Sequence, residues 1–154
     1  MKNKQQPRQP SEPLYEFKSA IYPRKFWVYF GDDPEFIAKT FDPHCEMTEA
    51  AQVAEMTDAL QSPGSTTNVY EEADKWLGIL LCFPKTNERE FRDNLRSFVH
   101  ESGHACDLLF QELGITKQDF DEGNEAYTYL LEWVFDNIYE SYLKYKETYE
   151  NNRK

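Results

Sequence analysis

The sequence predicts a single-domain α+β protein. Residues 25–30 (KFWVYF) form a short aromatic and β-branched run, typical of a buried strand, whereas apolar residues in the second half recur at helical spacing. The 154 residues, 40% hydrophobic and 16% aromatic, are enough to bury one ordinary core. We therefore expect one domain over residues 14–150. Residues 1–13, rich in lysine, glutamine and proline, are expected to form a flexible tail.

Helix signals follow the first strand. Asp33 as N-cap and Pro34 at the first helical position predict a short helix to about Phe41. Residues 45–61 contain good helix formers and are expected to form a helix, although much of their apolar face is alanine. Residues 62–65 (SPGS) are typical of a loop.

Two further strands are expected at 68–72 and 76–83, joined near 73–75. The second of these (WLGILLCF) is apolar at successive positions, which is typical of a strand buried on both faces. We therefore expect it to lie centrally in the sheet and to end before Pro84.

Two long helices complete the expected fold. Asn87, with Glu90 three residues on, predicts a capping box, and Gly114 predicts the end of that helix. Asp119 or Asp121 could cap a last helix over about 122–147. The predicted core positions of the first helix are Phe91, Leu95, Phe98, Ala105, Leu109 and Leu113. Those of the second are Tyr127, Leu131, Val134, Ile138, Tyr142 and Tyr145.

Charge and composition exclude several functions. The net charge of -11 and the pI near 4.7 argue against binding to nucleic acid or to an anionic membrane. Imitation of nucleic acid by this acidic surface is a less favoured alternative. Neither a membrane-spanning run nor a signal peptide is evident, so we expect a cytoplasmic protein. The three cysteines, Cys45, Cys82 and Cys106, are expected to be reduced.

Residues 100–104 form the pattern His-Glu-x-x-His within the first long helix. Residues four apart lie on one side of a helix, so the imidazoles of His100 and His104 can reach one metal ion, with Glu101 beside it. Both histidines fall nearly opposite the apolar stripe, which argues against buried core histidines. Two solvated surface histidines remain the alternative unless another element faces them.

A hydrolytic zinc site needs a third protein ligand and a position open to water. In this respect the chain resembles the gluzincin metallopeptidases, whose thermolysin-like members place that ligand in an Asn-Glu-Ala-type motif on the next helix. Here Asn124-Glu125-Ala126 follows His104, with Glu125 21 residues beyond that histidine. The resemblance implies that His100, His104 and Glu125 bind Zn²⁺ and that Glu101 is the general base. Glu122 and Glu132 are alternative third ligands.

The chain departs from the gluzincin pattern in two places. The family has an aspartate one turn after its ligand glutamate, where this chain has Tyr129; Asp107 is an alternative hydrogen-bond acceptor for a ligand histidine. The family's oxyanion-stabilising residue lies in a downstream domain that has no counterpart here, so Tyr127 or Tyr129 is the expected substitute. In size and layout the chain is more similar to small His-Glu-x-x-His proteins of phages and related mobile elements.

These resemblances imply a minimal zincin-like domain, with a small sheet packed on the active-site helix, that hydrolyses peptide or protein substrates. In zincins an extended peptide pairs with a free strand edge, which the hairpin of residues 68–83 would supply. Tyr70 and Glu71 are candidate substrate contacts, although ordinary hairpin roles are favoured. The alternative function is a non-catalytic acidic interaction or inhibitor protein with a structural or vestigial zinc. The sequence leaves the oligomeric state open.

Overall fold

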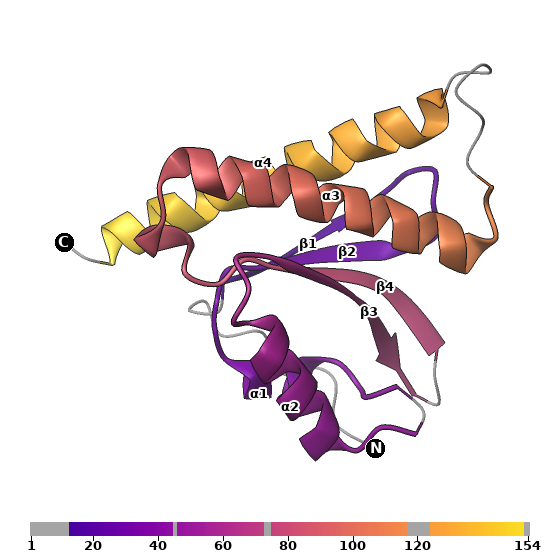
Figure 1. Ribbon diagram of the computed structural model, residues 1–154, viewed down its shortest axis with the longest axis horizontal. Coiled ribbons are helices and arrows are strands. Elements are labelled where there is room, and N and C mark those ends of the chain that lie inside the picture. The colour runs from indigo at the N-terminus through magenta and orange to yellow at the C-terminus, as the bar shows by residue number, and fades with distance from the viewer. Residues whose placement is uncertain (1–12, 45, 73–74, 117–123, 153–154) are drawn as a thin grey trace.

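A computed structural model places a four-stranded sheet between two pairs of helices (Figure 1). It describes residues 13–44, 46–72, 75–116 and 124–152. Residues 1–12 of the expected tail, Cys45 and the candidate caps Asp119 and Asp121 lie outside the described residues. The elements are β1 (Leu14–Lys18), β2 (Lys25–Tyr29), α1 (Pro34–Thr40), α2 (Glu49–Ala59), β3 (Ser65–Glu71), β4 (Lys75–Cys82), a 3-10 turn (Thr86–Glu88), α3 (Phe91–Leu113) and α4 (Glu125–Asn151).

The sheet has the strand order β1-β2-β4-β3. Its two central strands, β2 and β4, are parallel, and each pairs with an antiparallel edge strand. The predicted α+β class, the strand β2 and the central place of β4 are confirmed. No strand was expected at β1, where apolar Leu14 and Phe17 are interspersed with charged residues over only five positions.

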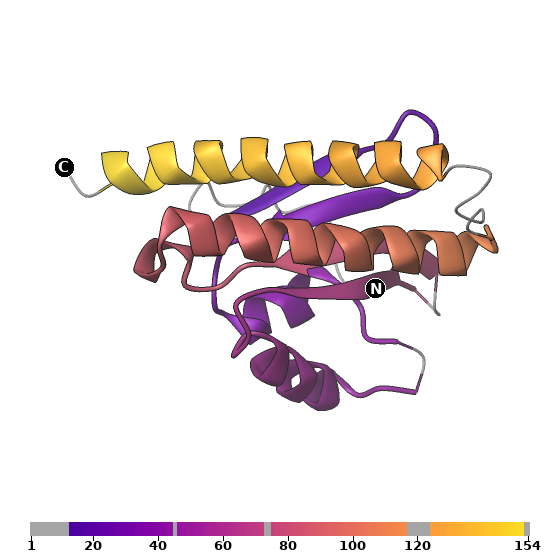
Figure 2. The ribbon, with the colours of Figure 1, turned by 45° about the horizontal axis from the view of Figure 1, so that its top comes forward.

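Both faces of the sheet are covered, which gives three layers (Figure 2). Phe26 and Val28 of β2 pack in the core beneath α3 and α4, whereas Trp27 and Tyr29 pack with residues of α1 and α2. This alternation follows from the two-residue period of a strand. It explains why β2 and β4 are apolar at successive positions.

Two of the three cysteines lie in this core. Cys82 and Cys106 are free and buried, as predicted. Burial raises the pKa of the Cys82 thiol to about 12. Both residues therefore act as small hydrophobic side chains, and the Cys82 thiol stays protonated at neutral pH.

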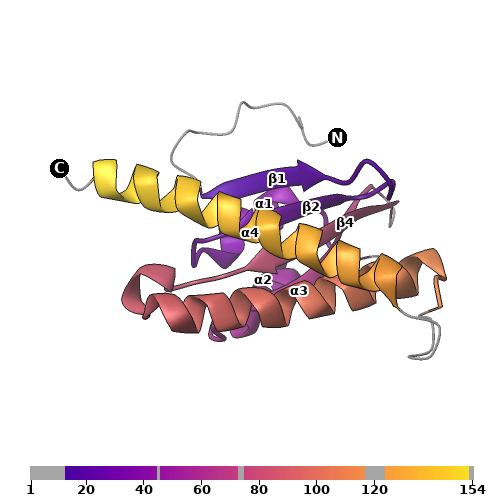
Figure 3. The ribbon, with the colours of Figure 1, turned by 90° about the horizontal axis from the view of Figure 1, so that it is seen from above.

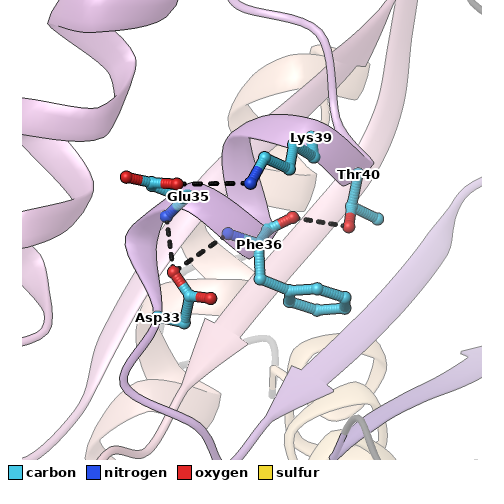
Figure 4. Close-up of polar contacts among 5 residues, drawn as sticks. All are labelled: Asp33, Glu35, Phe36, Lys39 and Thr40. Carbon is cyan, nitrogen blue, oxygen red and sulfur yellow. Dashed lines mark hydrogen bonds and ion pairs between the residues drawn. The ribbon is translucent and has the colours of Figure 1, made fainter. Parts of the chain in front are cut away.

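The start of α1 has the predicted cap (Figure 4). The Asp33 carboxylate accepts hydrogen bonds from the backbone N–H groups of Glu35 (2.9 Å) and Phe36 (3.2 Å). Pro34 occupies the first turn, where no N–H is needed. One turn on, the ammonium of Lys39 forms an ion pair with Glu35 at 3.2 Å. Local sequence signals are therefore sufficient to specify this helix.

The start of α3 differs from the prediction. The helix begins at Phe91, and the predicted capping box of Asn87 and Glu90 is wrong. The Asn87 amide instead donates to the Tyr145 hydroxyl at 2.6 Å, which ties the chain before α3 to α4. A tertiary hydrogen bond has replaced the local cap. The other end is as predicted, because Gly114 closes α3 with a positive φ of 66°.

The remaining helices differ mainly in their bounds. α2 is shorter than predicted and begins after Thr48, whose hydroxyl accepts from the Ala51 N–H at 3.1 Å. α4 extends four residues further than 147, to Asn151. Phe91, predicted to be a core residue, is 50% exposed, because it lies at the first position of α3, beyond the main core.

α3 and α4 run antiparallel across one face of the sheet (Figure 3). α3 packs against β3 and β4, so the helix that carries His100 and His104 lies beside the edge strand β3. Among the described residues, no helix has the length and apolar character needed to cross a bilayer.

Candidate metal centre

The two histidines of the His-Glu-x-x-His pattern turn toward one another. Both side chains are exposed on α3, and their Nε2 atoms lie 3.0 Å apart. The i, i+4 spacing accounts for this, because it stacks the two imidazoles one turn apart on the same helix face. The helix therefore presents two nitrogen donors to the same point outside its surface.

This arrangement fits two ligands of one zinc ion. Two nitrogens bound to a tetrahedral zinc at about 2.0–2.1 Å lie about 3.3 Å from each other, close to the observed separation. Imidazole is also a preferred zinc ligand. The pair can thus supply two of the three protein ligands of a hydrolytic zinc.

Glu101 occupies a different environment from its neighbours. It is 5% exposed and points from α3 toward β3, where the Thr66 hydroxyl donates to its Oε2 at 2.7 Å. The same hydroxyl lies 3.3 Å from the Glu101 backbone carbonyl. Thr66 therefore fixes the carboxylate and joins α3 to the edge strand β3.

Gly64 makes room for this carboxylate. A Cβ atom at that position would lie 2.7 Å from Glu101 Cγ and 3.1 Å from its Oε1. Only glycine fits at that distance without moving Glu101. The histidines, the carboxylate and the start of β3 border one open hollow of about 420 Å³, lined by Gly64, Ser65, Thr66, His100, Glu101, His104, Asp107 and Leu108.

Asp107 connects this hollow to α4. Its Oδ1 accepts a hydrogen bond from the Tyr127 hydroxyl at 2.8 Å, and that hydroxyl also lies 3.2 Å from the Gly103 carbonyl. Burial and the hydrogen bond to Asp107 raise the pKa of Tyr127 well above its usual range, so the phenol stays protonated. Of the two tyrosines proposed from the sequence, Tyr127 contacts α3, whereas Tyr129 is 63% exposed.

Among the described residues, no third candidate ligand lies close to the two histidines. Within the described ranges, no three His, Cys, Asp or Glu side chains are grouped closely enough to hold a metal. Glu125 opens α4 with an exposed side chain and is not grouped with the histidines, and Glu132 is likewise exposed on α4. Glu122 lies outside the described residues.

Sequence reasoning did not find Thr66 or Gly64. Nothing in the local sequence links Thr66 to the helix, because 35 residues separate it from Glu101. Gly64 was interpreted only as part of a loop. Of the two candidate substrate contacts, Glu71 forms an ion pair with Lys75 across the hairpin at 2.7 Å, as expected of an ordinary hairpin residue.

Replacing Thr66 with valine is expected to lower the free energy of unfolding by about 2 kcal/mol, because it leaves a buried carboxylate without its hydrogen-bond donor. Urea unfolding followed by circular dichroism measures this. Thr67→Val on the same strand is the matched control, since no described hydrogen bond joins Thr67 to α3. Equal effects of the two changes would contradict the role of Thr66.

Comparison with known proteins gives no relative from which to extend these observations. No protein-family model, no curated protein and no solved structure matches this chain.

Proposed function

We propose that the protein is a zinc-dependent peptidase that resembles the gluzincins. The observation that carries the proposal is the meeting of two imidazoles and a fixed carboxylate in one hollow. His-Glu-x-x-His on a helix supplies the residue types, and the second element that faces them is β3. That Ser65 and Thr66 of β3 line the same hollow as both histidines supports a shared site over two unrelated surface histidines.

Each residue has a distinct part in the proposed reaction. His100 and His104 would hold the metal, which when bound would acidify a water molecule and polarise the scissile carbonyl as a Lewis acid. Glu101 accepts the proton of the attacking water and delivers it to the leaving amine. Thr66 holds the carboxylate in place from β3. The Tyr127 hydroxyl positions Asp107 at the edge of the hollow.

A carboxylate at or before the start of α4 is proposed as the third ligand. Glu125 remains the first candidate because it carries the Asn-Glu-Ala motif, and Glu122 is the second. Bringing Glu125 to the histidines requires a shift of the first turn of α4. Glu125→Ala is expected to lower the zinc content, and unchanged zinc would assign the ligand to Glu122, Glu132 or an aspartate.

The proposed substrate is an extended peptide. β3 is an edge strand and lies along the helix that carries the histidines. Asp42 bridges to Tyr70 at the far end of this edge, so the segment from Ser65 to Val69 is where a peptide would add as a further strand. We place this reaction in the cytoplasm, where buried free thiols such as Cys82 and Cys106 stay reduced.

Zinc-dependent cleavage is the direct test. We expect the purified protein to hydrolyse a mixture of random octapeptides, detected by mass spectrometry, to lose this activity with 1,10-phenanthroline, and to regain it with added Zn²⁺. His100→Ala should lose both bound zinc and hydrolysis, because one imidazole cannot replace two. His44→Ala, which changes the third histidine, is the control for zinc content. Zinc-loaded protein that cleaves no octapeptide would rule out the peptidase.

A further inference from the structure

A second hollow, of about 370 Å³, lies along the free edge of β3, next to the one that the histidines line. Residues 66–70 of β3 border it, together with residues of α2 and Leu108 of α3. Thr66 and Asn68 form hydrogen bonds with glutamates of α3, whereas Val69 packs with residues of α1 and α2. Successive side chains from both faces of a strand can border one space only along its edge. The hollow is therefore where a neighbouring strand would lie.

The chain itself occupies one end of this strand position. Asp42 forms an isolated antiparallel bridge with Tyr70, and its backbone N–H donates to the Tyr70 carbonyl at 3.1 Å. Along residues 65–69, no described backbone group pairs with the outer edge of β3. The space beside residues 65–69 therefore matches an added strand in line with Asp42.

Gln52 lies on the wall that α2 forms and has an unused acceptor. Its amide nitrogen donates to the Phe41 carbonyl at 3.3 Å, which fixes the orientation of the amide. Its Oε1 is buried and has no hydrogen-bond partner among the described residues. The same holds for the Oδ1 of Asn68, whose amide nitrogen donates to Glu112 at 3.1 Å. A buried acceptor without a donor is destabilising, so two of them beside one hollow indicate an occupant that supplies N–H or O–H groups.

The position of Gln52 suits the main chain of such an occupant. Phe41 directly precedes Asp42, so the hydrogen bond to Phe41 places the Gln52 amide at the end of the hollow where Asp42 bridges to β3. An extended peptide has two edges that carry N–H groups, and only the inner edge can pair with β3. The N–H groups of the outer edge lose water in the hollow and need acceptors. Gln52 supplies one on that side.

We propose that α2 is the outer wall of the peptide groove and that Gln52 is a positioning residue, whose Oε1 accepts a hydrogen bond from a main-chain N–H on the outer edge of an extended peptide. Because the contact is to the main chain, it selects no side chain. It aligns the peptide along β3 toward Thr66, which borders both hollows and contacts Glu101. The inference rests on the proposed function for its class of ligand, a peptide, but not on cleavage.

The test measures peptide binding to full-length Glu101→Gln protein in the presence of Zn²⁺, so that no peptide is consumed. The probes are two fluorescein-labelled pools of ten-residue peptides with random uncharged side chains. The first pool has an unmodified main chain. The second is N-methylated at every second residue, which removes the N–H groups of one edge and leaves the other edge free to pair with β3. Fluorescence anisotropy gives the Kd of each pool.

Substitutions of Gln52 separate its two hydrogen-bonding groups. Gln52→Met should raise the Kd of the unmodified pool about fivefold, because one neutral hydrogen bond is lost while the size of the side chain is kept. Gln52→Glu retains an acceptor but cannot donate to Phe41, and should bind within about twofold of the parent protein. Gln61→Met, on an exposed residue that follows α2 outside the hollow, is the control and should leave the Kd unchanged.

The N-methylated pool tests the contact itself. It should bind the parent protein about fivefold more weakly than the unmodified pool, and Gln52→Met should weaken it no further, as in a double-mutant cycle on two groups that touch. Circular dichroism checks the fold of each variant, and Gln52→Ala replaces Gln52→Met if methionine does not fit. Equal weakening of both pools by Gln52→Met, a loss in Gln52→Glu or Gln61→Met as large as in Gln52→Met, or no binding by either pool would overturn the inference.

Binding and cleavage can fail separately. Wild-type protein that cleaves no octapeptide, while the unmodified pool still binds through Gln52, would disprove the peptidase and support the groove. Cleavage of peptides, with no effect of Gln52→Met on their binding, would do the reverse.

Discussion

Replacing Glu101 with glutamine is expected to lower kcat for peptide hydrolysis at least about a hundredfold, while the protein keeps its zinc. Glutamine preserves the shape of the side chain and can still accept a hydrogen bond from Thr66, but it cannot take a proton from water. Initial rates on a cleaved octapeptide measure the first effect, and elemental analysis measures the second.

Glu140→Gln, on an exposed residue of α4, is the control and should change neither quantity. Unchanged kcat in Glu101→Gln would remove Glu101 from the chemistry. Loss of zinc together with activity would instead indicate that Glu101 is needed for the structure of the metal site. A variant without hydrolysis that still binds or inhibits a partner protein as the wild type does would favour the non-catalytic interaction protein.

Replacing Gly78 with alanine is expected to have the largest effect on stability, a loss of at least about 3 kcal/mol. Gly78 has a φ of 152°, and a Cβ atom there would lie 1.8 Å from the Lys25 carbonyl oxygen. Lys25 is its pairing partner in the parallel register of the two central strands. Alanine would therefore separate β2 from β4, which urea unfolding would detect as a lower midpoint or as an unfolded protein.

Gly103→Ala is the opposite control. Gly103 lies inside α3, and a Cβ atom there would meet no other atom within 4 Å. Alanine is the better helix former, so this change should raise the free energy of unfolding by about 1 kcal/mol. If the two substitutions shifted stability in the same direction, the close approach at Gly78 would not be the cause.

The sequence was most informative where short-range chemistry decides the structure. Asp33 and Pro34 predicted the start of α1, and Gly114 predicted the end of α3, because caps depend on residues within one turn. The unbroken apolar run of β4 predicted a central strand, because a strand covered on both faces has no polar side. The exposed side of α3 was predicted from helical periodicity alone.

The sequence was least informative where distant segments meet. Asparagine is favoured at the N-cap of a helix, yet the side chain of Asn87 forms a hydrogen bond with Tyr145, 58 residues away. Glu101 was placed beside a metal, but its burial against Thr66 depends on the pairing of β3 at the sheet edge. β1 was not predicted, because its five residues form a strand only by pairing with β2. These contacts follow from topology, which no local pattern encodes.

The central claim is that His100 and His104 bind one zinc ion beside Glu101. Anomalous diffraction at the zinc absorption edge, from crystals grown with Zn²⁺, tests this most directly. We expect a single strong peak within bonding distance of both Nε2 atoms, with a carboxylate as third ligand and water in the open position. A peak bound to only one of the histidines, or no peak in the hollow they share with Glu101, would contradict the account.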